Sequence, residues 1–215
     1  MFTPPITRWA GSVSLTAAAV LCASQILNLA LGLMLGSDST PMLTHTLKNA
    51  LALLAQYLLL LALTGLYVHE YRAVGKLGLV GYLTAFLGTL LVAGDWWYEA
   101  FVVPQIAAHT PQLFEVAPGG SLLAGAVATF GLFALGWILF GTASLRGRIF
   151  PRIPTILVII GGAVGLFAGT APYLLPLAVA VGWMGYLLLR PSPTRHDAVA
   201  PARRSPATPR DAAAG

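Results

Sequence analysis

Long apolar segments joined by short polar connections are the feature that most limits what this chain can fold into. Six such segments lie near residues 11–35, 46–68, 77–103, 121–143, 155–168 and 173–189. A helix that crosses about 30 Å of hydrocarbon needs about 20 apolar residues. Only helices and closed barrels cross lipid, and barrel strands would alternate polar and apolar residues. The continuous segments therefore predict an all-α fold, a polytopic transmembrane helical bundle of six spans over residues 1–190.

Composition supports a membrane location. Of the 215 residues, 57% are hydrophobic and only 9% are charged, whereas a soluble domain has about 25% charged residues. The first apolar segment is longer than the apolar region of a signal peptide and lacks an A-x-A cleavage site, so we expect it to be a retained span.

The positions of the basic residues predict the orientation. Eleven of the twelve lysines and arginines fall on one side of the alternating topology, and only Lys48 lies on the other. Short cytoplasmic loops carry an excess of Lys and Arg. We therefore predict that both termini are cytoplasmic (N-in/C-in) and that the protein lies in the inner, or plasma, membrane. The eleven basic residues are Arg8, Arg72, Lys76, Arg146, Arg148, Arg152, Arg190, Arg195, Arg203, Arg204 and Arg210.

The last two apolar segments are short, and the chain after them is polar. Two tilted spans are our first prediction for residues 155–189, and a re-entrant hairpin with a turn at 170–172 is the alternative. Either arrangement leaves the carboxyl terminus on the cytoplasmic side.

Residues 191–215 are rich in Pro, Ala and Arg, so we expect a disordered basic tail that contacts membrane lipids. Nothing in it indicates nucleic-acid binding.

Small residues recur at spacings that suit helix packing in lipid. Gly32 with Gly36, Gly81 with Ala85, and the series Gly161, Gly165 and Gly169 are the examples. Contacts within the bundle are the preferred interpretation over dimerisation, and the sequence leaves the oligomeric state undetermined.

The segment that most strongly indicates a functional site combines two acids with three aromatic residues near the outer end of the third span. It is Gly94-Asp95-Trp96-Trp97-Tyr98-Glu99. Asp95 and Glu99 are one helical turn apart and share a helix face. Ionisable groups at membrane depth are costly and usually face a bundle interior or a wet cavity. Trp96 and Trp97 favour the membrane interface, which puts the two acids near the outer head groups.

Two further ionisable residues are predicted to lie at the same depth. The second and third spans are antiparallel, and about 20 residues separate their connection from Lys48 on one side and from Asp95 on the other. His45, one turn beyond Lys48, matches Glu99 in the same way. We therefore expect His45, Lys48, Asp95 and Glu99 to converge.

Three interpretations of this group are open. Lys48 could form a structural ion pair with Asp95 or Glu99. The acids could instead form a functional pocket, since neighbouring carboxyls can be pushed into different protonation states. A metal site could use His45, Asp95, Glu99 and His109. No compact histidine motif is present, so we expect neither a metal nor another cofactor.

A second polar group lies nearer the middle of the membrane. Gln25 and Asn28 share a face of the first span, and Gln56 is midway along the second. Hydrogen bonds between helices are the default interpretation. A polar path that leads from these residues to Asp95 is the alternative.

Two stretches of the chain resemble small multi-pass membrane proteins of unknown function from high-GC, actinobacterial-type bacteria. The resemblance covers about the middle half of the chain and implies a multi-span helical fold without an activity. The residues that carry it are Gly94, Asp95, Trp96, Trp97, Glu99, Ala100, Phe101, Val102, Val103, Pro104, Phe133, Gly136, Trp137, Phe140, Gly141, Leu145, Arg146, Arg148, Pro151 and Arg152.

Three functions remain as hypotheses. The leading one is a membrane protein that binds or transports a small or lipidic ligand at an outward-facing acidic and aromatic pocket. The second is an acid-catalysed cyclase or isomerase of a prenyl-type lipid, in which Asp95 or Glu99 donates a proton. The third is a structural or accessory membrane protein without a ligand. No recognised catalytic motif is present, which favours a non-enzymatic role.

Overall fold

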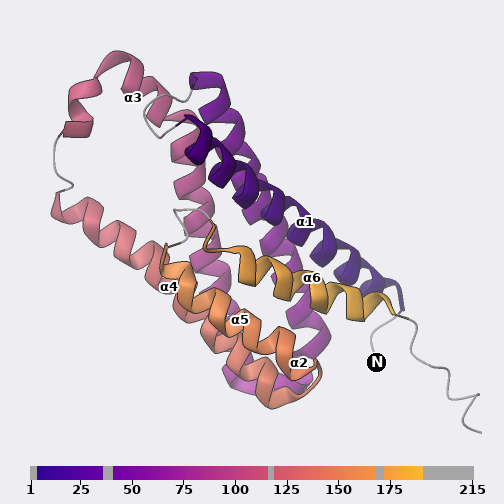
Figure 1. Cartoon of the computed structure of the whole chain (residues 1–215). Helices are drawn as coiled ribbons and strands as arrows, with labels where there is room; N and C mark the ends of the chain where they lie inside the picture. Colours follow the sequence, from indigo (N-terminus) through magenta and orange to yellow (C-terminus); the bar gives the residue numbers. More distant parts are fainter. Residues whose placement is uncertain (1–3, 36–40, 116–118, 168–171, 191–215) are drawn as a thin grey trace, which may run out of the picture.

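The computed structural model of the chain describes residues 4–35, 41–115, 119–167 and 172–190. Within these ranges every regular element is a helix, so the predicted all-α architecture is confirmed there (Figure 1). The tail predicted at 191–215 lies outside the described residues. The elements are α1 (Pro4–Leu35), α2 (Met42–Phe101), α3 (Val103–His109), η1 (Pro111–Glu115), α4 (Gly120–Gly147), α5 (Arg152–Val164), η2 (Gly165–Phe167) and α6 (Leu175–Leu189).

Three helical stretches of the described chain are long and apolar enough to cross a membrane. They are Pro5–Met34, Met42–His109 and Gly120–Gly147. Many large apolar side chains on their surfaces are exposed, such as Leu33, Leu83 and Leu122. An outer surface of this kind has lipid as its natural solvent, which agrees with the predicted membrane protein.

Helix α2 is a helical hairpin. At Gly75 the backbone has φ 59° and ψ −152°, a conformation that glycine adopts readily because it has no Cβ. The two arms, residues 42–74 and 76–101, therefore fold back on each other. The Thr64 and Tyr82 hydroxyl oxygens are 3.3 Å apart, and the rings of Tyr67 and Tyr82 stack with centroids 4.3 Å apart. The arms correspond to the predicted second and third spans, but one residue replaces the predicted connecting loop.

Helix α4 packs closely on the second arm of α2 because glycines remove side chains from the contact. A Cβ added at Gly136 would overlap the backbone of Ala85, and one added at Gly88 would overlap the backbone of Phe133. A Cβ added at Gly81 would lie 2.6 Å from the Phe140 backbone nitrogen. The predicted packing role of Gly81 and Ala85 is confirmed, whereas Gly136, which faces Ala85, and Gly88 were not recognised from the sequence.

The other predicted glycine contacts have different outcomes. A Cβ at Gly161 would lie 2.7 Å from the Leu177 backbone nitrogen, and one at Gly165 would lie 2.6 Å from the Phe133 ring. No atom lies within 4 Å of a Cβ added at Gly32, so close packing there is not observed. Gly36 and Gly169 lie outside the described residues.

Helices α5 and α6 form a short V that enters the bundle only part of the way. They have 13 and 15 residues, which correspond to roughly 20 Å each and fall short of a full membrane crossing. Figure 1 shows that α5 ends about midway along α4. The Leu174 amide, at the start of α6, donates a hydrogen bond of 3.3 Å to the buried Gln25 side chain in α1. Neither helix is among those long enough to cross a membrane by length and composition, so the prediction of two full spans is not confirmed.

Candidate functional site

The ends of the two α2 arms that lie far from Gly75 carry the ionisable group identified in the sequence. His45 Nε2 and Glu99 Oε2 are 3.8 Å apart. Asn49, one turn after His45, donates from Nδ2 to the backbone oxygen of Glu99 over 3.4 Å and lies 3.2 Å from His45 Nε2. The first arm therefore holds Glu99 by its side chain and by its backbone.

A polar cavity of about 340 Å³ lies at this level of the bundle. This volume falls within the range of small-molecule sites, roughly 300–1,000 Å³. The structure thus brings the predicted His45, Lys48, Asp95 and Glu99 together around one space. The cavity is lined by Asn28, His45, Lys48, Asn49, Asp95, Trp96, Glu99 and Phe130.

The ion pair of Lys48 with an acid that was considered from the sequence is not observed in the described part of the chain. The side chain that lies near Glu99 is that of His45, which forms an ion pair with it only when the imidazole is protonated. The side chains of His45 and Glu99 are 25% and 39% exposed. Solvent-exposed pairs of this kind contribute little to stability. Lys48, Asp95 and Glu99 all line the cavity, and Lys48 forms no ion pair with either acid among the described residues.

A second cavity, about 430 Å³ in volume, adjoins the first as a groove between α2 and the beginning of α4. Asp95, Glu99 and Phe130 line both spaces. The carboxyl groups of Asp95 and Glu99 therefore lie at the boundary between the polar cavity and the groove, whose wall is mostly apolar. The groove is lined by Leu91, Asp95, Tyr98, Glu99, Ser121, Leu122, Gly125, Ala126, Thr129 and Phe130.

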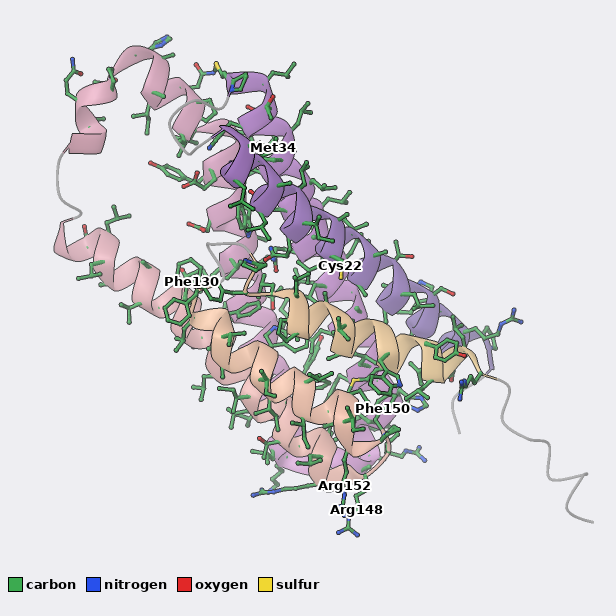
Figure 2. All side chains as sticks on the ribbon, viewed as in Figure 1. Cys22, Met34, Phe130, Arg148, Phe150 and Arg152 are labelled. Atoms are coloured by element: carbon green, nitrogen blue, oxygen red, sulfur yellow. The ribbon has the colours of Figure 1, made fainter. Side chains whose placement is uncertain are left out.

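The groove exists because the first part of α4 has few neighbours. Leu122, Leu123 and Val127 are each more than half exposed. The α5–α6 hairpin packs on the later part of α4, where Gly165 meets the Phe133 ring, and does not extend to these residues (Figure 1). Phe130 lies close to the level at which α5 ends (Figure 2), so it separates the packed part of α4 from the open part.

The two tryptophans of the acidic segment have different environments. Trp96 is 6% exposed and lines the polar cavity, and its Nε1 donor has no partner among the described residues. Trp97 is 50% exposed and contacts Phe101 with ring centroids 5.9 Å apart. Trp97 lines neither cavity, so its predicted place in the pocket is not observed.

The three amides predicted nearer the middle of the membrane do not form one path. Asn28 reaches the polar cavity and donates from Nδ2 to the Ser24 backbone oxygen over 2.9 Å. Gln25 instead accepts the hydrogen bond from the Leu174 amide at the start of α6. Gln56 is buried, and both of its side-chain polar atoms lack a partner in the described chain. Gln25 therefore positions the hairpin, and only Asn28 belongs to the site.

The histidine considered as a further ligand lies elsewhere. His109 ends α3 and lines neither cavity. Across the described ranges, no group of three or more His, Cys, Asp or Glu side chains is arranged to hold a metal ion.

Two residues of the polar cavity, Asn49 and Phe130, were not predicted from the sequence. Asn49 could have been found, because it lies one turn from His45 on the same helix face. Phe130 could not, because its role depends on where α5 ends beside α4.

Comparison with protein-family models, with curated proteins and with solved structures finds no match for this chain. The resemblance to small multi-pass membrane proteins therefore stays a prediction, and the geometry of the site carries the functional argument.

Proposed function

We propose that this chain is an inner-membrane protein that binds a small or lipidic ligand at an acidic pocket open to the outer leaflet. One observation carries the proposal, namely that Asp95 and Glu99 line both a polar cavity and an apolar groove. A ligand with a polar and an apolar part would satisfy both spaces at once. Ligand sites of this type are mostly apolar and have a few polar groups that fix the ligand's orientation.

The proposed orientation depends on the positive-inside rule. Two basic groups, at residues 72–76 and 146–152, lie at one end of the bundle, because Gly147 packs against Ala73 and Val74. Arg148 and Arg152 mark this end in Figure 2. With this end in the cytoplasm, the pocket faces the outer leaflet. The chain then crosses the membrane with α1, both arms of α2 and α4, and α5 and α6 enter and return from the cytoplasmic side.

The topology can be tested at the tip of the hairpin. Tyr173→Cys, in a chain with Cys22→Ser, is expected to resist a membrane-impermeant maleimide added from outside, because the next residue, Leu174, lies beside Gln25 of α1 and the proposed topology puts this level within the membrane. Thr110→Cys, beyond α3, should react from outside, and Arg148→Cys should react only after permeabilisation. Reaction of Tyr173→Cys from outside as readily as Thr110→Cys would instead indicate two full spans.

The ligand proposal can be tested by native mass spectrometry of protein purified in mild detergent. The wild-type chain should retain a bound molecule, and the double variant Asp95→Asn/Glu99→Gln should lose it. Each charge-assisted hydrogen bond contributes roughly 1.5–3 kcal/mol, so the loss of both should lower retention by at least about tenfold.

Trp97→Phe is the matched control, because Trp97 lies in the same turn of helix and lines neither cavity. The control should retain the molecule. If the double variant keeps the molecule but melts at a lower temperature, the two acids are structural and the proposal is wrong.

A further inference from the structure

The charges that face the polar cavity restrict the head group of the ligand. Two carboxylates, Asp95 and Glu99, and one ammonium group, that of Lys48, line it together with His45. With His45 neutral, the fixed charges sum to −1. A simple anion would be repelled by the two acids, and a simple cation would leave Lys48 without a partner. A head group that carries both signs would pair with all three.

Hydrogen-bonding capacity separates zwitterions from one another. The carboxylates accept hydrogen bonds, so a primary ammonium with three N–H donors suits them. A quaternary ammonium has no N–H group to donate and usually requires a cage of aromatic rings. Apart from the imidazole of His45, the lining residues of the polar cavity contribute two aromatic side chains, Trp96 and Phe130, whereas charged and amide side chains make up the rest.

The donor for the anionic part of such a head group is Lys48, which lines the polar cavity. Lys48 supplies an ammonium group, which binds phosphate as a point charge.

The adjoining groove has the character of an acyl-chain site. Leu91, Leu122, Ala126 and Phe130 contribute apolar surface to it. Gly125 leaves its wall open, since no atom lies within 4 Å of a Cβ added there. The carboxyls at the junction then hold the head group next to the beginning of the chain.

We propose that the ligand is a zwitterionic phospholipid with a primary amine, of the phosphatidylethanolamine type. Its ammonium lies between Asp95 and Glu99, its phosphate lies at Lys48, and one acyl chain lies in the groove between α2 and α4. This inference rests on the proposed ligand-binding function and adds the chemical class of the ligand.

The test uses the full chain reconstituted in vesicles that contain equal amounts of phosphatidylethanolamine, phosphatidylglycerol and phosphatidylcholine with identical acyl chains. Native mass spectrometry then identifies the retained lipid. We expect phosphatidylethanolamine to exceed each of the others by at least about tenfold. Gly125→Leu, which fills the groove, should lower its retention by a similar factor. Gly131→Leu is the control, because Gly131 is equally open and lines neither cavity.

The outcomes separate the two proposals. If phosphatidylglycerol or phosphatidylcholine is retained equally well, and retention still depends on Asp95 and Glu99, the lipid class is wrong and the ligand site stands. If Gly125→Leu and Gly131→Leu behave alike, the groove does not hold an acyl chain and the inference is overturned. If no molecule is retained in a manner that depends on the two acids, both proposals fail.

Discussion

Gly136→Ala is expected to cause a large loss of stability for a single added methyl group. A Cβ at residue 136 would overlap the backbone of Ala85, and backbone atoms in the middle of two packed helices cannot move aside as a flexible side chain can. Overpacking in a well-packed core costs about 1–3 kcal/mol and sometimes more. Thermal unfolding in detergent should therefore give a lower melting temperature than that of the wild-type chain.

Gly131→Ala is the matched control for this prediction. Gly131 lies in the same helix, and no atom comes within 4 Å of a Cβ added there. Alanine is a better helix former than glycine by about 1 kcal/mol, so this variant should be as stable as the wild type or more stable. Equal melting temperatures for the two variants would contradict the close contact between α2 and α4.

The second large effect is expected at Glu70, whose side chain is fully buried near the Gly75 end of the first α2 arm. The Ser144 hydroxyl in α4 donates to Glu70 Oε1 over 2.5 Å, and Oε2 has no partner in the described chain. Glu70→Ala removes the acceptor, leaves a buried hydroxyl unpaired and opens a hole. We expect it to cost about 2 kcal/mol or more.

Glu70→Gln should behave differently, because glutamine keeps the Oε1 acceptor and nearly the same shape. Its free energy of unfolding should lie between those of the wild type and Glu70→Ala, because its Nε2 donor replaces Oε2, which has no partner in the described chain. Ser144→Ala tests the other side of the bond and should resemble Glu70→Ala. If Glu70→Gln is as damaging as Glu70→Ala while Ser144→Ala is harmless, the hydrogen bond between Glu70 and Ser144 is a minor contribution and the prediction is wrong.

These contacts lie in one half of the bundle, and the site lies in the other half. Glycines at the α2–α4 crossing and the Glu70–Ser144 hydrogen bond keep the half of the bundle nearer Gly75 closed. The other half contains the end of α1, the ends of the α2 arms and the exposed beginning of α4. Because the hairpin of α5 and α6 supports only the first half, the acidic pocket can be open while the bundle remains firmly packed.

Part of the site follows from helix geometry and could be predicted from the sequence. Asp95 and Glu99 share a face because they are four residues apart, and the fixed rise per residue of antiparallel helices puts His45 and Lys48 at their level. The length and low charge of the apolar segments likewise determine an all-helical protein with lipid-facing surfaces. These are local properties, which any arrangement of the bundle has to respect.

Other features depend on how the helices pack against one another. Nothing in the residues around Lys48 shows that His45 would be the residue near Glu99, because rotamers and the Asn49 contact decide which side chain reaches it. The role of Gln25 depends on a partner 149 residues away, and that of Phe130 on the point where α5 ends. By itself the sequence determined the long apolar helices and the depth in the bundle at which Asp95 and Glu99 lie. Only the tertiary structure decided that they stand between a polar cavity and an apolar groove, because that boundary is made by helices that meet from distant parts of the chain.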